Sequence, residues 1–210
     1  MLPLLGFLFA AYILGSTPTS YWIGKGLYGV DLRNEGSGNL GATNTYRVLG
    51  WKAAIPVFVV DVLKGWFPVW WFPRLAGTGD ASWAIAFGAA AVLGHVFSFW
   101  VGFRGGKGVA TSAGVLAALA PWSVAAGFGV WVIVILVTRM VSAGSMAAAV
   151  AAPVAAAFTA DVPRSVTAFL ALLGLFILWA HRSNIRRILA GTEARLGRRP
   201  HSEEVPGGAS

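Results

Sequence analysis

The sequence predicts an all-α integral membrane protein with about seven membrane-spanning helices, some of them short or broken. Of its 210 residues, 57% are hydrophobic and 11% are charged, whereas a soluble domain carries roughly 25% charged residues. The mean hydropathy is +0.70. The charges are also segregated, because none lies within 1–24, 108–138 or 165–181. A membrane span needs about 20 mainly apolar residues, and these stretches supply them.

The predicted helices follow in order along the chain. The first apolar segment lacks the basic start and the cleavage site of a signal peptide, so we expect it to be retained as a helix. The second contains Asp61 and Lys64, three residues apart, which we expect to form a buried ion pair. Pro121 interrupts a long uncharged run, which we therefore divide into two helices. The predicted segments are Leu2–Gly24, Ala53–Phe72, Ser82–Val101, Val109–Ala120, Pro121–Val137, Ala143–Ala160 and Ser165–Ala180.

Basic residues set the predicted orientation. With the N-terminus outside and a break at Pro121, Arg139 and the basic cluster at 182–199 lie on the cytoplasmic side, as the positive-inside rule requires. The C-terminus is then cytoplasmic. We expect residues 1–195 to form a single membrane domain and residues 196–210, which are polar and rich in Gly and Pro, to form a disordered tail.

Composition also limits the chemistry. The chain has no cysteine, which excludes disulfides and thiolate nucleophiles, and its three histidines are far apart in the sequence. We therefore do not expect a zinc site. The net charge of +8 lies in short loops beside apolar spans, which is typical of a protein that contacts anionic lipid headgroups or anionic ligands rather than nucleic acid. No obligate protein partner is evident.

Polar residues gather in three islands that this topology places at the cytoplasmic face. In the first, glycines allow backbone N–H groups to converge on an anion, hydroxyl and amide groups add donors, and an arginine suits phosphate. Its candidate residues are Gly36, Ser37, Gly38, Asn39, Asn44 and Arg47. Residues 36–41 match G-x-G-x-x-G, but an apolar helix precedes them where a dinucleotide-binding fold needs a strand.

The second island carries a lysine between glycines at the start of a predicted helix. A cation there adds to the free amides of the helix N-terminus and suits a phosphate. The Ser or Thr of a Walker A loop is replaced by Gly108, so this is not a P-loop. The candidates are His95, Gly105, Gly106, Lys107, Gly108 and Thr111.

The third island lies near the C-terminus. His181 and Asn184 share one helical face, and Glu193 is positioned either to orient His181 or to hold a basic neighbour. Arg186 and Arg187 fit equally well as positive-inside anchors or as ligands. The predicted break also brings Ser142 and Ser145 to the same side.

Three segments together resemble one family, the PlsY acyl-phosphate–glycerol-3-phosphate acyltransferases of bacteria. They are GSGNLGATNTYRVLG, GHVFSFWVGFRGGKGVAT and HRSNIRRILAGTE, within a resemblance that runs from Tyr12 to Glu193. One departure is Ser98, where the family usually has proline. The resemblance implies a seven-span protein of the bacterial inner membrane, with its active site facing the cytoplasm, that makes 1-acyl-glycerol 3-phosphate from acyl phosphate and glycerol 3-phosphate without a cofactor.

The resemblance also suggests roles for the candidate residues. Ser37, Lys107, His181 and Asn184 are the expected catalytic residues. Ser37, Gly38, Asn39 and Lys107 would bind acyl phosphate, and Asn44, Arg47, His181 and Asn184 would hold glycerol 3-phosphate. No Ser-His-Asp arrangement supports an acyl-enzyme, so direct transfer is expected. The alternative is a transporter or channel for a phosphorylated metabolite, since polar islands at broken helices also occur there.

Overall fold

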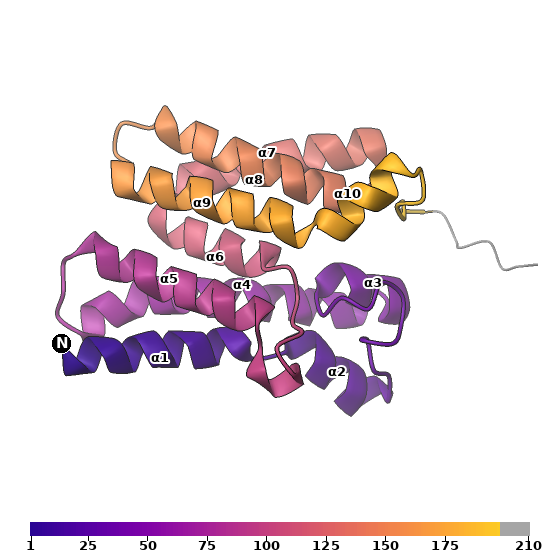
Figure 1. The fold of residues 1–210 in the computed structure, drawn as a ribbon, viewed down its shortest axis with the longest axis horizontal. Helices are drawn as coiled ribbons and strands as arrows, with labels where there is room; N and C mark the ends of the chain where they lie inside the picture. Colours follow the sequence, from indigo (N-terminus) through magenta and orange to yellow (C-terminus); the bar gives the residue numbers. More distant parts are fainter. Residues whose placement is uncertain (198–210) are drawn as a thin grey trace, which may run out of the picture.

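The computed structural model describes residues 1–197, which form α-helices and one 3₁₀ turn and no strand (Figure 1). The elements are α1 Leu2–Ser16, α2 Thr19–Tyr28, α3 Ala42–Leu49, α4 Trp51–Leu75, α5 Ala81–Val96, η1 Phe99–Val101, α6 Val109–Leu119, α7 Pro121–Thr138, α8 Val141–Ala157, α9 Arg164–Ala180 and α10 Arg182–Leu189. The all-α prediction is confirmed. Most of the predicted tail, residues 198–210, lies outside the described residues.

The helices form two groups that meet along a seam (Figure 1). In one group α1 packs on α5 and α4 packs on α6, while in the other α8 packs on both α7 and α9. Helix α6 lies between the groups and also contacts α7 and α9. The largest apolar core cluster lies here, with Val115 and Leu116 of α6 packed among residues of α8 and α9.

Glycines allow the helices of the first group to cross at very short range. A Cβ on Gly65 of α4 would lie 2.1 Å from the Thr111 carbonyl oxygen, and one on Gly114 of α6 would lie 1.9 Å from the Val62 carbonyl oxygen. No side chain fits in either place. Small residues are the usual means by which helix backbones approach inside a bilayer, so this crossing fixes α6, and the loop before it, on α4.

The N-terminal segment differs from the single helix expected over 2–24. It breaks at Thr17 into α1 and α2, which are bent by 42°. Thr17 has an extended ψ of 111° because the ring of Pro18 disfavours helical backbone at the residue before it. The predicted third helix ends earlier than expected, at Val96, and is followed by the 3₁₀ turn.

The break at Pro121 is confirmed, since Ala120 leaves the helical region with φ −152° and ψ 72° between α6 and α7. Among the described residues, three helices are long and apolar enough to cross a membrane, or up to five spans if each bent pair counts as one. The two bent pairs are α1 with α2 and α9 with α10, and α6 and α8 are shorter apolar helices.

Candidate active site

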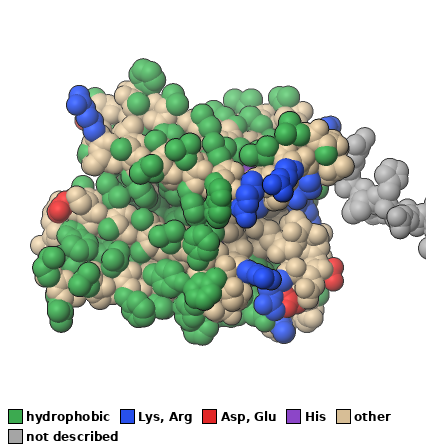
Figure 2. Space-filling model, viewed as in Figure 1, with side chains coloured by type: hydrophobic (Ala, Val, Ile, Leu, Met, Phe, Trp, Pro, Cys, Tyr) green, Lys and Arg blue, Asp and Glu red, His purple; other side chains and the backbone are tan. Residues whose placement is uncertain are grey.

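A cavity of about 570 Å³ lies along the seam between the two groups of helices. One end is polar and is lined from α3, the glycine-rich loop 102–108 before α6, α8 and α10, including Arg47, Lys107, Ser142 and Asn184. The other end is apolar and is formed by α6, α7, α8 and α9, with Leu116, Phe128, Ala152 and Leu170 among its walls. In Figure 2 most of the visible Lys and Arg side chains gather at one end of the molecule, on both sides of the seam.

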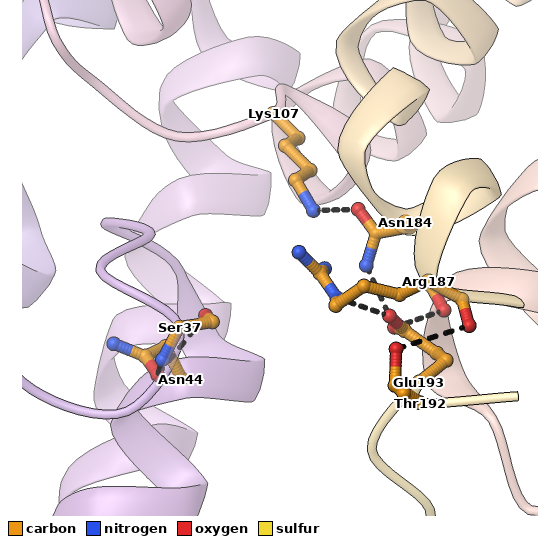
Figure 3. A network of polar contacts seen from close by, with 8 residues as sticks. Ser37, Asn44, Lys107, Asn184, Arg187, Thr192 and Glu193 are labelled. Atoms are coloured by element: carbon orange, nitrogen blue, oxygen red, sulfur yellow. Dashed lines mark hydrogen bonds and ion pairs between the residues drawn. The ribbon is translucent and has the colours of Figure 1, made fainter. Parts of the chain in front are cut away.

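The carboxylate of Glu193 organises the polar end (Figure 3). Its Oε1 accepts hydrogen bonds from Ser142 Oγ at 2.6 Å and Asn184 Nδ2 at 2.7 Å, and its Oε2 pairs with Arg187 Nε at 2.7 Å. The Asn184 Oδ1 in turn accepts a hydrogen bond from the Lys107 ammonium. Four segments are thereby joined: the loop before α6, helix α8, helix α10 and the chain that follows α10.

Lys107 is positioned by backbone contacts of the glycines before it. The N–H groups of Gly105 and Gly106 donate to the carbonyls of Val96 at 3.0 Å and His95 at 3.2 Å. A Cβ on Gly106 would lie 2.2 Å from His95 Nε2 and 2.4 Å from the Leu40 carbonyl oxygen, so only glycine fits. Gly108, with φ +80°, caps α6. These glycines therefore position the lysine, and neither Gly105 nor Gly106 lines the cavity.

The first island forms the opposite wall of the polar end. Asn44 is 1% exposed and holds the loop, since its Oδ1 accepts from Ser37 N at 2.8 Å and Oγ at 3.1 Å while its Nδ2 donates to the carbonyls of Leu32 and Glu35. Gly36 and Gly38 have φ of +59° and +68° and shape the turn, without lining the cavity. Ser37 and Asn39 line it.

Electrostatics favour an anion at this end. Three positive side chains, Arg47, Lys107 and Arg187, lie near the carboxylate of Glu193, and these four groups together carry an excess of two positive charges. The carboxylate of Asp61, which also lines the cavity, is paired with Lys64. Burial, and then the charge of Arg187, lowers the pKa of the Lys107 ammonium to about 8. Burial also lowers the pKa of Arg47. Burial raises the pKa of Glu193, but hydrogen bonds from Ser142, Asn184 and Arg187 outweigh it, so that the net shift is downward.

Asp61 and Lys64 form the predicted buried ion pair at 2.7 Å, each about 3% exposed. Thr19 Oγ1 donates to Asp61 at 3.2 Å and Lys64 Nζ donates to the Thr17 carbonyl at 2.7 Å, so the pair also ties α4 to the break between α1 and α2. Asp61 lines the cavity, as does His95. The His95 Nδ1 lies 3.8 Å from Asp61 Oδ1, too far for a hydrogen bond.

The structure also shows where Thr111 and His181 lie relative to the cavity and to Glu193. Thr111 does not line the cavity, because it lies on the face of α6 that crosses α4 at Gly65. His181 Nδ1 bonds to the Ile177 carbonyl at 2.8 Å, so Glu193 does not orient His181; it holds the basic Arg187, which was the other possibility. His181 and Ser145 line the cavity, and Ser145 Oγ donates to the Val141 carbonyl at 2.9 Å.

Sequence reasoning missed two features of the site. Arg187 was left undecided between anchor and ligand, and its pairing with Glu193 makes it part of the polar end. Ser112, on the cavity wall with a buried hydroxyl, was not singled out. No local pattern distinguishes it from the other hydroxyl side chains of the helices.

Comparison with known proteins identifies this arrangement. A family model described as glycerol-3-phosphate acyltransferase matches residues 5–191. The chain belongs to this family. A glycerol-3-phosphate acyltransferase of Synechococcus sp. (strain JA-2-3B'a(2-13)) is 47% identical over 90% of this chain and 92% of the relative. One from Gloeobacter violaceus is 44% identical over 92% of this chain and 95% of the relative.

Two solved structures of the acyltransferase PlsY, an integral membrane protein, have the same fold. The crystal structure of its glycerol 3-phosphate form has a TM-score of 0.85 and 42% identity, covering 92% of this chain and 96% of that chain. Its lysophosphatidic acid form has a TM-score of 0.82 and 39% identity, covering 92% and 95%. The protein is thus a multi-pass integral membrane glycerol-3-phosphate acyltransferase of the PlsY family.

Proposed function

We propose that the protein transfers a fatty acyl group from acyl phosphate to glycerol 3-phosphate, giving 1-acyl-glycerol 3-phosphate (lysophosphatidic acid) and phosphate. The observation that carries the proposal is the continuity of a cationic end and an apolar end within one cavity. Acyl phosphate has the same division, with an anionic head on a hydrocarbon chain.

The polar end suits two phosphorylated substrates. Its excess of two positive charges faces the anions that both substrates carry, and desolvated cations bind phosphate more strongly than exposed ones. We assign Ser37, Gly38, Asn39 and Lys107 to acyl phosphate, with Gly38 shaping the loop. Arg47, Asn44, His181 and Asn184 are assigned to glycerol 3-phosphate, and Asn184 also positions Lys107 through their hydrogen bond.

The apolar end suits an acyl chain. From Leu170 at the apolar end to His181, the residue that caps its C-terminus at the polar end, α9 follows the cavity over 11 residues, or about 16 Å at 1.5 Å per residue. This length is close to half of the roughly 30 Å hydrocarbon core of a bilayer, and so to the chain of one lipid leaflet. The alanines of α8 that line this part keep it open.

The reaction proposed is a direct transfer in a ternary complex. The C1 hydroxyl oxygen of glycerol 3-phosphate attacks the acyl carbon, the bond from that carbon to the bridging phosphate oxygen breaks, and phosphate leaves with the electron pair. The hydroxyl proton passes to a substrate phosphate. Lys107 and Arg47 neutralise the phosphates, and positioning supplies much of the rate enhancement because acyl phosphate is already activated.

We also propose that the protein lies in the bacterial inner membrane with seven spans, its N-terminus outside and the polar end of the cavity at the cytoplasmic face. The distribution of Lys and Arg supports this orientation (Figure 2), since most of those visible gather at the polar end. Both substrates are then available from the cytoplasm.

The test uses purified protein with glycerol 3-phosphate and either palmitoyl phosphate or palmitoyl-CoA as donor. We expect lysophosphatidic acid and free phosphate in equal amounts from the acyl phosphate only. Turnover of palmitoyl-CoA at a comparable rate would contradict the donor assignment. A stable acyl adduct on the protein in the absence of glycerol 3-phosphate would contradict direct transfer.

A further inference from the structure

One buried hydroxyl on the cavity wall has no partner in the protein. Among the described residues, the hydroxyl oxygens of Ser20, Thr111, Ser112 and Ser123 are buried without a hydrogen bond. Of these four residues only Ser112 lines the cavity, and its side chain belongs to a residue that is 3% exposed. A buried hydroxyl without a partner costs roughly 1–3 kcal/mol, so such a group in a substrate cavity points to a ligand as its partner.

Other hydroxyl side chains on helices of this protein show which hydrogen bond the Ser112 hydroxyl could have made. Ser16, Thr45 and Ser145 each donate to the carbonyl four residues earlier, at 2.8, 3.1 and 2.9 Å. The Ser112 hydroxyl does not make the equivalent bond to the Gly108 carbonyl, which accepts the Ser112 N–H at 2.7 Å. The oxygen itself has almost no exposed surface in this rotamer, so donation to a group in the cavity requires rotation about the Cα–Cβ bond to another staggered rotamer that faces the cavity.

The place of Ser112 on α6 lies between the two chemical environments of the cavity. Lys107 and Gly108 line the polar end one turn before it, and Leu116 lines the apolar end one turn after it. A turn of helix rises about 5.4 Å, so the hydroxyl lies deeper than the lysine and above the apolar wall. The acyl carbonyl of a bound acyl phosphate occupies the corresponding place between phosphate and hydrocarbon chain.

We propose that Ser112 is a further catalytic residue, whose hydroxyl donates a hydrogen bond to the carbonyl oxygen of the acyl phosphate. This rests on the proposed function. When the glycerol hydroxyl oxygen bonds to the acyl carbon, the carbonyl oxygen takes up the electron pair of the C=O π bond and becomes an oxyanion. The pair returns as the bond to the phosphate oxygen breaks. The serine keeps its proton throughout and stabilises the oxyanion, whose charge exists only near the transition state.

The experiment compares wild type, Ser112→Ala and Ser123→Ala, each purified, in their kcat and KM with palmitoyl phosphate and glycerol 3-phosphate. Ser123 is the matched control because its hydroxyl is also buried and unpaired but lies outside the cavity lining. We expect Ser112→Ala to lower kcat about 10- to 100-fold, within the range of losses for one oxyanion donor, and to change the KM for glycerol 3-phosphate less than twofold. Ser123→Ala should behave as wild type.

A thermal unfolding measurement on the same proteins separates this role from a structural one. Since the Ser112 hydroxyl has no protein partner, its removal should leave Tm unchanged or raised, so lost activity with intact Tm supports the proposal. Wild-type kcat in Ser112→Ala, or a loss of kcat matched by a fall in Tm, would overturn it. Wild type that makes no product from palmitoyl phosphate would refute the proposed function, whereas active wild type with an unaffected Ser112→Ala refutes this inference alone.

Discussion

Lys107→Ala is the substitution that tests the cationic end of the cavity most directly. The lysine contacts Asn184 and is one of three cations set against the carboxylate of Glu193, so its loss halves the excess of positive charge from two to one. At 4 Å, two unit charges interact by about 1 kcal/mol in water and about 4 kcal/mol at an effective dielectric of roughly 20. We therefore expect a loss of about 2–4 kcal/mol of transition-state stabilisation.

That loss corresponds to a fall in kcat/KM of roughly 30- to 1000-fold, measured as phosphate release from palmitoyl phosphate with glycerol 3-phosphate. Lys107→Arg should also be poor, because a guanidinium does not superpose on an ammonium held against Asn184. Lys52→Ala is the matched control, since Lys52 is an exposed lysine near the same face that does not line the cavity. Near-full activity of a folded, membrane-inserted Lys107→Ala protein would refute the reasoning.

Three further predictions follow from the same geometry. Glu193→Gln should lower Tm and should lower kcat by about tenfold or more, because the carboxylate accepts hydrogen bonds from Ser142, Asn184 and Arg187. The same substitution at the exposed Glu35 should change neither quantity, and an unaffected Glu193→Gln protein would contradict the role of Glu193 in organising the polar end. The KM for palmitoyl phosphate should rise about tenfold per pH unit above a pH of about 8, because the Lys107 ammonium, whose pKa is about 8, loses its proton there. A KM that stays constant up to a pH of about 9.5 would contradict this prediction. A cysteine at exposed Arg139, the sole thiol in the chain, should react with impermeant reagents only from the cytoplasmic side, and external labelling would reverse the orientation.

The fold could be predicted from the sequence where the signal is local. Charge-free segments marked the apolar helices, and the proline at 121 marked the break between α6 and α7. The break at Thr17 had an equally local signal in Pro18, and reading 2–24 as one helix overlooked it. Helix α10 was less visible because it is short and highly polar.

The candidate site could be predicted only in part, because its residues meet through tertiary packing. Polar islands at helix ends indicated which residues gather at one face, and Lys107, Asn184 and Glu193 do meet there. The pairing of Arg187 with Glu193 depends on the turn after α10, which no periodicity encodes. The Ser112 hydroxyl is unpaired because of the groups that surround it in the folded protein. The sequence shows that a serine is present but not which groups lie around it.

The glycine crossing of α4 and α6 also affects how inactive mutants of this enzyme would be read in a genetic screen. Gly65 and Gly114 touch no residue of the polar end, yet any side chain at either position meets a backbone carbonyl within about 2 Å. Relief of that clash requires α4 and α6 to move apart, which displaces Lys107 and Ser112 relative to α4. A selection for loss of function would therefore return alleles at these two glycines with the phenotype of active-site alleles, and suppressors of them would map to the facing helix rather than to the substrate-binding residues.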